Sequence, residues 1–180
     1  MVRSFESSLY QEQSKGLVLT DPLVVNFGGV PAKLTLEKVA FDLNSDGQKD
    51  QISFLESGSG FLALDKNQDG QINNGKELFG TQSGNGFKDL AAFDSDQNGW
   101  IDENDAIFSQ LQIWHKDENG LNQLSGLLEL NIGAIYLKHE ETQFSLKDNS
   151  NQLLGQVVKS GVFIGEDHKL SSVQQIDLVI

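Results

Sequence analysis

Apolar and polar residues alternate along two segments of the chain that flank a short acidic stretch. Val39, Phe41 and Leu43 alternate with polar residues before this stretch, and Ile52 and Phe54 do so after it. Strict alternation puts every second side chain on one face, as in a β-strand with one buried side. The pattern therefore predicts a strand, an acidic loop and a second strand.

Helical spacing is found in the middle of the chain. In GFKDLAAF (86–93), Phe87, Leu90 and Phe93 fall on one face of a 3.6-residue period, which predicts a short amphipathic helix. A second helix is predicted in NDAIFSQL (104–111), after a further acidic stretch.

Beyond residue 124 the pattern changes again. LSGLLELNIG predicts a short helix that ends near Gly133. Apolar residues then alternate in several segments separated by turns rich in Asn, Gly and Asp, which is typical of an antiparallel β meander. These segments are AIYLKH, TQFSLKD, QLLGQVVKSGVFI and VQQIDLVI.

Three acidic stretches repeat oxygen-bearing side chains at positions 1, 3 and 5 and place a glycine at position 6. They are DLNSDGQKD from Asp42, DKNQDGQIN from Asp65 and DSDQNGWIDEND from Asp94. A short loop folds around Ca²⁺ in this way, because glycine allows the turn and the hard ion takes about six to eight oxygens. We therefore predict that the chain binds about two to three Ca²⁺ ions.

The first loop lies between the two predicted strands. Lys49 stands at the eighth position, where an EF-hand has an apolar residue, and Ser53 stands at the twelfth. The loop is therefore not an EF-hand, and we interpret it as a hairpin site completed by backbone carbonyls. Its candidate ligands are Asp42, Asn44, Asp46, Gln48 and Asp50.

The second loop resembles an EF-hand loop with one extra residue. Position 12 is Lys76, which cannot be a ligand, and the carboxylate comes one residue later, at Glu77, after Gly75. We interpret Glu77 as the bidentate ligand; the alternative, a carboxylate that starts a helix, stays open. The candidate ligands are Asp65, Asn67, Asp69, the Gln71 carbonyl, Asn73 and Glu77.

The third loop has the most complete EF-hand pattern and lies between the two predicted helices. Ile101 takes the apolar eighth position, and Asp105 replaces the usual glutamate at position 12. The shorter arm of Asp is expected to lower Ca²⁺ affinity and selectivity over Mg²⁺. The candidate ligands are Asp94, Asp96, Asn98, the Trp100 carbonyl, Asp102 and Asp105.

A fourth stretch, HKDENGLNQ (115–123), is interpreted as a decayed loop or a plain hairpin turn, because few carboxylates follow Asp117. The three histidines are scattered without acidic neighbours at ligand spacing, so we assign them no catalytic or metal role. Trp100 and Trp114 are expected to anchor the core or turns.

Together these elements predict an α+β fold. A centre of calcium loops and short helices, similar to an EF-hand, packs on antiparallel β-hairpins, and the C-terminal half is rich in β-structure. Residues 1–19 are predicted to be a flexible N-terminal segment and residues 20–180 a single calcium-binding domain. Within it we expect a calcium-loop lobe at 36–118 and a β-rich lobe at 124–180.

Charge supports a role for cations. The chain carries 13 basic and 26 acidic residues, a formal net charge of −13, and residues 42–118 hold 15 Asp or Glu against 5 Lys. Self-repulsion of this kind opposes folding unless cations offset it. Nucleic acid is excluded as a partner, because phosphate binding needs clustered Lys and Arg. Anionic membranes are disfavoured for the same reason.

Three absences bear on location. No apolar run is long enough to span a membrane, and no signal-peptide h-region follows Met1. Cys is absent, which excludes disulfides and thiolate metal sites and suits an exported bacterial protein. We expect a monomer that is secreted or held at the bacterial surface without membrane insertion. A cytoplasmic location stays open, and no protein partner can be named.

Several segments, in order, resemble the calcium-binding, EF-hand-like module of bacterial RTX-type proteins. They are DPLVVNFGG, FDLNSDGQKD, SGFLALDKNQDGQINNGKELFG, GFKDLAAFDSDQNGWIDENDAIFSQLQIW and GLLELNIGAIYL, within residues 20–138. One branch is the self-processing module of FrpC-like proteins. There, Ca²⁺-induced folding triggers cleavage of an Asp–Pro bond at the start of the module, and the new terminal Asp can be joined to a Lys. Asp21–Pro22 occupies the matching place.

In that branch the Asp side chain attacks its own carbonyl to form a cyclic anhydride, and proline leaves. The modules usually continue after Pro-Leu into an acidic calcium loop. This chain departs from the pattern, with Asn26, Phe27, Gly28 and Gly29 in that region. Because the folded module must hold Asp21 in attack geometry, we expect the Asp21–Pro22 bond to stay largely intact here.

Three functions follow as hypotheses. The first is a calcium-binding structural module of an exported or surface bacterial protein, folded and stabilised by Ca²⁺, with no enzymatic activity. The second is a Ca²⁺-dependent self-cleaving peptidase at Asp21–Pro22. The third is a calcium-gated protein-interaction module resembling dockerins, which share the DxNxDGxIN core.

Overall fold

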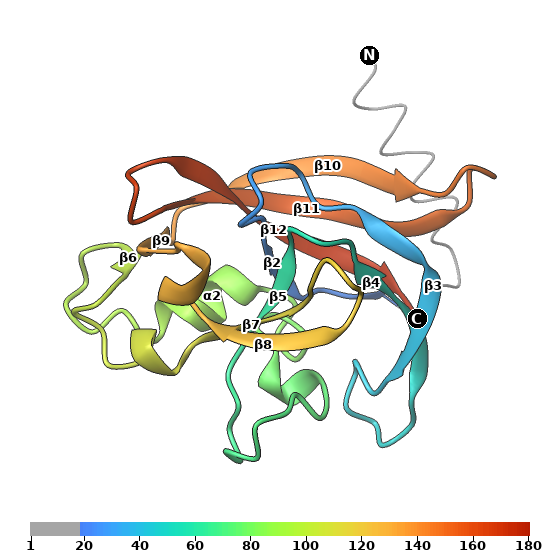
Figure 1. Cartoon of the computed structure of the whole chain (residues 1–180), viewed down its shortest axis with the longest axis horizontal. Helices are drawn as coiled ribbons and strands as arrows, with labels where there is room; N and C mark the ends of the chain where they lie inside the picture. Colours follow the sequence, from blue (N-terminus) through green and yellow to red (C-terminus); the bar gives the residue numbers. More distant parts are fainter. Residues whose placement is uncertain (1–18) are drawn as a thin grey trace.

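Strands β1 to β12 are the main regular elements of residues 19–180, which are the residues that this computed structural model describes (Figure 1). Strands account for 44% of the described residues and helices for 9%. The strands are β1 (Leu19–Thr20), β2 (Leu23–Val25), β3 (Leu34–Phe41), β4 (Asp50–Leu55), β5 (Gly60–Ala63), β6 (Trp100–Ile101), β7 (Gln112–Lys116), β8 (Asn122–Gly126), β9 (Ala134–Tyr136), β10 (Glu140–Lys147), β11 (Leu153–Ile164) and β12 (Leu170–Val179). The helical segments are the α-helix α2 (Gly86–Ala91) and the 3₁₀ turns η1 (Gly75–Glu77), η2 (Phe108–Gln110) and η3 (Leu128–Leu130).

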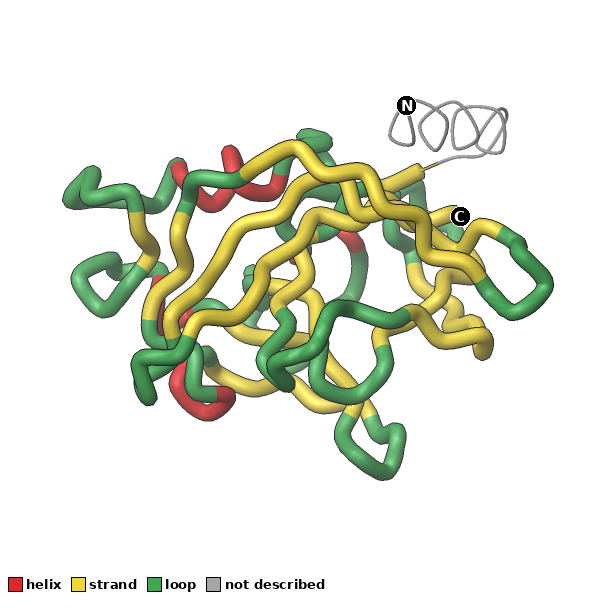
Figure 2. Tube along the Cα trace, turned by 90° about the horizontal axis from the view of Figure 1, so that it is seen from above, coloured by secondary structure: helices red, strands yellow, loops and turns green. Residues whose placement is uncertain are grey.

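Ten of the strands form one antiparallel sheet. Its order is β6-β9-β11-β12-β2-β5-β7-β8, with β1 also paired to β12 and β10 to β11. The strands β3 and β4 form a separate hairpin. Figure 2 shows that the long strands bend together, so the large sheet curves into a half-barrel. Because β2 lies between β12 and β5, strands from the two ends of the described chain meet inside the sheet.

Two hydrophobic cores lie on opposite faces of the large sheet. In β2, Leu23 and Val25 belong to the first core and Val24 to the second, because successive side chains of a strand point to opposite faces. All three are fully buried. The first core also holds α2 and the apolar residues around the third loop. The second core lies between the large sheet and the β3–β4 hairpin.

Aromatic rings join the β3–β4 hairpin to the large sheet in the second core. Phe41 and Phe54 of the hairpin lie 4.7 and 4.8 Å from the ring centroid of Trp114 on β7. Phe54 also meets Phe61 on β5 edge to face, with a centroid distance of 5.2 Å. Such pairs contribute about 0.5–1.5 kcal/mol beyond the area they bury. Trp114 is thus a core anchor, as expected.

The predicted α+β class with an EF-hand centre is wrong, because the described residues form a mostly antiparallel β protein. Only α2 is an α-helix among residues 19–180. The helix predicted over 104–111 is reduced to η2, and the one predicted over 124–133 becomes the end of β8 followed by η3. Short helices are marginal without tertiary support, and here the neighbouring strands β7 and β8 recruit the flanking residues.

Other predicted elements are confirmed. The strand–loop–strand at the first acidic loop is the β3–β4 hairpin. The last three segments of the predicted C-terminal meander are β10, β11 and β12, paired in sequence order, but the first segment, AIYLKH, forms β9, which pairs with β11 and β6 and not with β10. The helix predicted over 86–93 is α2, which begins after Asn85 and buries Phe87 and Leu90. The predicted flexible segment 1–19 lies, except for Leu19, outside the described residues.

Candidate metal centre

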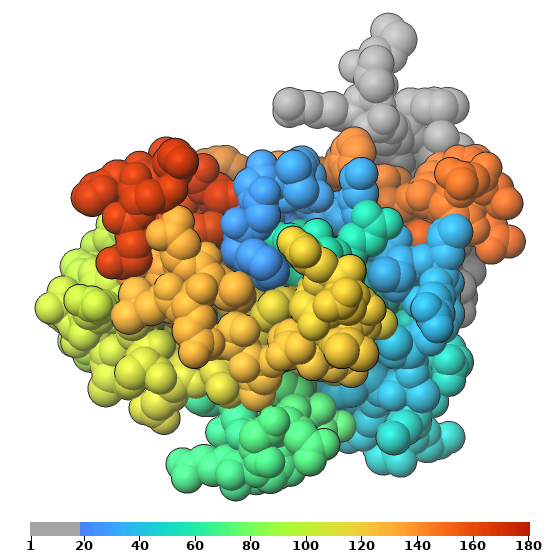
Figure 3. All heavy atoms as spheres, viewed as in Figure 1, coloured from blue at the N-terminus to red at the C-terminus, as the bar shows by residue number. Residues whose placement is uncertain are grey.

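The three acidic loops share one backbone conformation. In each loop, positions 4 and 6 have left-handed φ angles, and position 6 is glycine, for which such an angle is unstrained. The φ values are 62° for Ser45 and 89° for Gly47 in the first loop, 59° for Gln68 and 78° for Gly70 in the second, and 59° for Gln97 and 85° for Gly99 in the third. The predicted turn at the sixth position is therefore present in all three loops. In Figure 3 the second loop projects from the body as the green segment.

The carboxylate at position 1 is turned into each loop. In the second loop, Oδ1 of Asp65 accepts the N–H of Asp69 at 3.3 Å, and Oδ2 accepts the N–H of Gly70 at 2.8 Å. The equivalent bonds hold Asp42 in the first loop and Asp94 in the third. These bonds preorganise the acidic side chains before any ion binds.

The other candidate ligands lie in the same turns. In each loop, the N–H at position 7 donates a hydrogen bond to the side chain at position 5. These bonds place Gln48 beside Asp46, Gln71 beside Asp69 and Trp100 beside Asn98. At position 3, Asn44 and Asp96 bond to the residue 5 side chain. At position 9, the side chains bond back to position 3 or 5, in the pairs Asn67–Asn73 and Asn98–Asp102.

Asp105 closes the third loop from its far end. Its carboxylate is 2% exposed, and it accepts the N–H of Ser95 at 2.7 Å and that of Asp102 at 3.1 Å. Burial raises the pKa of Asp105, but these hydrogen bonds outweigh it and leave the pKa below its usual value. Asp94, Asp96 and Asp105 each present an oxygen within 4.8 Å of the others.

Glu77 occupies the equivalent place in the second loop. It is 5% exposed and accepts the N–H of Lys66 at 3.1 Å and that of Asn73 at 2.7 Å. Like Asp105, it therefore ties positions 2 and 9 of its loop together. Glu77 is the last residue of η1 and starts no helix. The geometry matches a loop lengthened by one residue.

The first loop has no closing carboxylate, but it shields one oxygen of Asp50. Oδ2 of Asp50 has no hydrogen-bond partner among the described residues. Burial and the nearby carboxylates of Asp46 and Asp42 raise the pKa of Asp50. A shielded oxygen without a donor is unfavourable unless a donor or a cation satisfies it.

These donor sets fit Ca²⁺. Every side-chain donor is an oxygen, the type of ligand that this hard cation prefers. In the described part of the chain, the ion pairs are Lys159–Glu141 and Lys169–Asp167, and neither involves a residue of the three acidic loops. The converging carboxylates of the loops therefore have no lysine or arginine partner there, and the orphaned oxygen of Asp50 lacks even a neutral donor.

The fourth acidic stretch is a hairpin turn between β7 and β8. Oδ1 of Asp117 accepts the N–H groups of Asn119 and Leu121, each at 2.9 Å, and Oδ2 accepts the Gln123 amide. The bond from Leu121 is the largest cause that lowers the pKa of Asp117. The carboxylate thus has a structural role in the turn, as the hairpin interpretation predicted.

The Asp21–Pro22 bond lies between β1 and β2, against the turn that follows the second loop. A β-carbon added to Gly80 would lie 2.1 Å from the Asp21 carbonyl oxygen, and one added to Gly84 would lie 3.4 Å from Oδ2 of Asp21. On the other side, Leu23 donates its N–H to the Phe79 carbonyl at 2.9 Å. The Pro22 carbonyl accepts a hydrogen bond from a β12 N–H at 3.1 Å. Sequence reasoning missed these glycines, whose only signal is their close spacing.

Residues 26–29 form a compact polar cluster in the place where the resemblance to FrpC-like modules predicts an acidic loop. The Asn26 side chain is fully buried and contacts Ser59, Ser172 and Gln174 at 2.7–2.8 Å. Gly28 donates its N–H to the Gly58 carbonyl at 2.7 Å. All of the Asn26 side-chain atoms are satisfied by protein, so this region offers no cation site.

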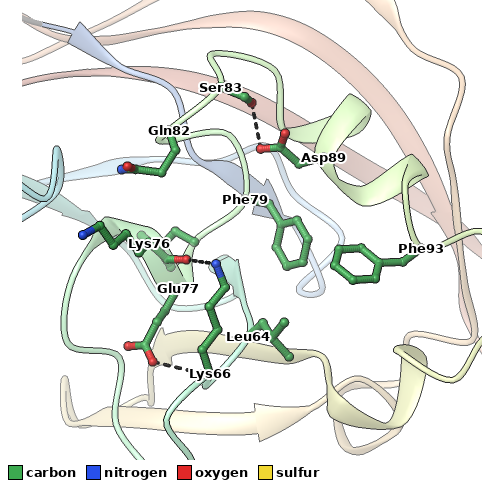
Figure 4. Close-up of a pocket in the computed structure, with 10 residues that line it drawn as sticks. Leu64, Lys66, Lys76, Glu77, Phe79, Gln82, Ser83, Asp89 and Phe93 are labelled. Atoms are coloured by element: carbon green, nitrogen blue, oxygen red, sulfur yellow. Dashed lines mark hydrogen bonds between the residues drawn. The ribbon is translucent and has the colours of Figure 1, made fainter.

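A cavity of about 310 Å³ lies beside the second loop (Figure 4). Leu64, Phe79 and Phe93 form its apolar wall, while Glu77 turns its carboxylate toward the Lys66 backbone and away from the two rings. The Lys66 ammonium group donates to the Lys76 carbonyl. The candidate metal ligand and the cavity therefore share a wall but face different ways.

Comparison with known proteins places this geometry in a family. A model described as the SPM domain matches residues 23–178. The chain is also 29% identical over 152 residues to the iron-regulated protein FrpA of Neisseria meningitidis serogroup C. That similarity covers 76% of this chain but 14% of FrpA, so the chain corresponds to a small part of this relative. Both findings fit a FrpC-like self-processing module. Because the family model spans most of its length, the chain belongs to the SPM domain family.

Proposed function

We propose that this chain is a calcium-binding module of an exported, RTX-like bacterial protein, and that ions held by its three loops stabilise the fold. The observation that carries the proposal is the convergence of Asp94, Asp96 and Asp105, whose oxygens lie within 4.8 Å of one another while Asp105 is almost completely buried. Like charges this close repel strongly in a partly buried site. A divalent cation removes that repulsion.

The relative supports the location. FrpA is named as an iron-regulated protein of a bacterium, and its relation to this chain suggests an exported RTX-like parent. Among residues 19–180, no helix is long and apolar enough to cross a membrane. The chain covers only 14% of FrpA.

Calorimetry tests the calcium proposal with a matched pair in the third loop. Asp96→Asn removes one carboxylate of the cluster, whereas Glu103→Gln neutralises an exposed residue at position 10 that is no candidate ligand. We expect the wild type and Glu103→Gln to bind the same two to three ions, and Asp96→Asn to lose one or bind it on the order of tenfold more weakly. Equal titrations for all three proteins would show that the charge of Asp96 contributes nothing to ion binding, and Asp94→Ala, which removes the first ligand, would then decide whether the third loop holds an ion at all.

A second function, cleavage of the Asp21–Pro22 bond, is favoured by the packing of Asp21 on Gly80 and Gly84. The residues after the bond are fixed by backbone hydrogen bonds of Pro22 and Leu23. In this reaction an Asp21 carboxylate oxygen attacks the Asp21 carbonyl carbon, the bond to nitrogen breaks, and the proline nitrogen takes up a proton. Water or a lysine amine then opens the anhydride.

Intact mass distinguishes the two functions. Purified protein is incubated overnight with millimolar Ca²⁺ or with EDTA, beside Asp21→Asn and the exposed-turn control Asp148→Asn. Because the polar cluster at Asn26 stands in place of the acidic loop expected beside the bond, we expect all samples to keep their full mass. Release of residues 1–21 in Ca²⁺, absent from Asp21→Asn alone, would instead establish self-cleavage.

A further inference from the structure

We propose that the first and second loops form one coupled calcium unit, in which an ion in either loop raises the affinity of the other, while the third loop binds independently. This proposal rests on the calcium binding proposed above and adds its regulation. It is argued from contacts between the loops, which the sequence alone does not show.

The backbones of the two loops are hydrogen-bonded to each other. Gly75 donates its N–H to the carbonyl of Asp42 at 2.9 Å, and Asp42 forms a parallel bridge with Asn74. Asp42 supplies the first candidate ligand of the first loop. Asn74 directly follows Asn73, the ninth residue of the second loop. The contact therefore joins the start of one loop to the end of the other.

This contact requires glycine. A β-carbon at Gly75 would lie 1.8 Å from the carbonyl oxygen of Leu43 and 2.8 Å from its carbonyl carbon, so the two backbones touch. Gly75 also lies within the part of the second loop that is lengthened by one residue, two positions before Glu77. The lengthened end of the loop is thus the part that reaches the first loop.

Side chains extend the contact. The Ser45 hydroxyl, at the left-handed fourth position of the first loop, donates to Oδ1 of Asn74 at 3.4 Å. The Gln82 amide, beyond η1, donates to the Ser45 hydroxyl at 3.3 Å. A shift of η1 would therefore move a residue inside the first turn of the first loop.

The third loop is attached elsewhere. Leu43 and Ile72 pack with the second core, whereas Ile101 is buried in the first core on the other face of the sheet. Among residues 19–180, none of the described hydrogen bonds joins the third loop to the other two. Two loops thus share a core and a backbone contact, and one loop shares neither.

The coupling follows from this geometry. An ion in the second loop fixes Glu77, and through η1 it fixes Gly75, which holds the Asp42 carbonyl. The first loop, which has no closing carboxylate, then needs less ordering to bind its own ion. By linkage the effect is reciprocal, and coupling between sites is typically about 5- to 150-fold in affinity. We expect about tenfold.

Each loop carries its own reporter for the test. The N–H groups of Gly47, Gly70 and Gly99 donate to the position 1 carboxylate of their loop, so their NMR signals follow occupancy loop by loop. The signals are recorded during Ca²⁺ titration of the whole chain. The variants are Asp46→Asn, which weakens the first loop, and Glu37→Gln, an exposed control on β3.

In Asp46→Asn we expect the Ca²⁺ midpoint of Gly70 to rise about tenfold and that of Gly99 to change less than about twofold. In Glu37→Gln neither midpoint moves. An unmoved Gly70 midpoint, or an equal rise for Gly70 and Gly99 through overall folding, would overturn the coupling while leaving calcium binding intact. If no glycine signal of the wild type responds to Ca²⁺, calcium binding itself is refuted, and the coupling with it.

A second variant addresses the contact directly. Gly75→Ala puts a methyl group into the Leu43 carbonyl, so adding Asp46→Asn to it should no longer move the Gly70 midpoint. A tenfold rise that persists in the double variant would show that the coupling does not pass through Gly75. If Gly75→Ala does not fold, the Asp46→Asn titration decides the proposal by itself.

Discussion

Glu77 and Asp105 are acidic residues with almost no solvent contact, and each is surrounded by N–H groups of its own loop. Hydrogen bonds of this kind favour the charged form of a carboxylate, and they leave the pKa of Asp105 below its usual value although burial raises it. The second and third loops therefore each have a carboxylate at the closed end, where it can contribute most to binding a cation. The extra residue in the second loop does not alter this arrangement.

Glu77→Gln tests the closing carboxylate. The substitution keeps the size of the side chain but removes the charge and one acceptor oxygen, so Ca²⁺ affinity at the Gly70 reporter should fall about tenfold or more. In EDTA the same variant should lose about 1 kcal/mol of stability, because a buried backbone N–H loses its charged acceptor. Glu56→Gln, an exposed carboxylate at the end of β4, is the control for both titration and melting. Equal affinity in the two variants would exclude Glu77 as a ligand.

Spacing alone was enough to predict the inward carboxylates, the sixth-position glycines and the displaced Glu77. It could not predict Gly75 against Leu43 or Gly80 against Asp21, because each contact joins segments that are distant along the chain. A glycine's need for room depends on its neighbour in space. A single sequence shows where the glycine is, but it does not show which distant segment lies next to it in the fold.

At the scale of elements, period-two alternation was the reliable signal. It predicted the β3–β4 hairpin and the meander of β10, β11 and β12, since β3, β4, β11 and β12 bury apolar side chains in a core. The helical signal was weaker. Ile107, Phe108 and Leu111 are spaced like a helix face and are all buried, but a 3₁₀ turn brings them to the first core equally well. Leu111 is already extended, and the chain enters β7.

The error in fold class has the same origin. Helices on both sides were predicted for the third loop. The helix before it is present as α2, but the one after it is reduced to η2, and the second loop follows the strand β5. The loop conformation depends on its own glycine and Asx bonds, so it forms between strands as well as between helices. The loop motif therefore predicts its own turn, but it does not determine whether helices or strands flank that turn.

For the whole molecule, the acidic charge predicts that calcium drives folding. If a site has a dissociation constant of about 10 μM, 1 mM Ca²⁺ adds roughly 2.7 kcal/mol, and two independent sites about twice that. A domain of this size is stable by about 5–15 kcal/mol in total. We therefore expect Tm in EDTA to be about ten degrees or more below Tm in Ca²⁺.

Calorimetric melting in EDTA, in Ca²⁺ and in Mg²⁺ provides the measurement. A variant with all three loops weakened, Asp46→Asn, Asp69→Asn and Asp96→Asn, serves as the reference. If each site binds Ca²⁺ about tenfold more weakly, 1 mM Ca²⁺ adds only about 1.4 kcal/mol per site, so Ca²⁺ should raise the Tm of this variant about half as much as that of the wild type. Identical curves for the wild type in both buffers would refute calcium-driven folding.

The position of β2 between β12 and β5 has a kinetic consequence. Asn26 and Gln174, which are hydrogen-bonded across this junction, are 148 residues apart in the chain. Pairings of such high contact order form late, because a long loop must close before any contact rewards it. Until β12 arrives, β2 lacks one neighbour and the β3–β4 hairpin lacks part of the surface that it covers. A chain that stops before Leu170 therefore loses an interior strand of the sheet, and its exposed β2 edge is open to pairing with other chains.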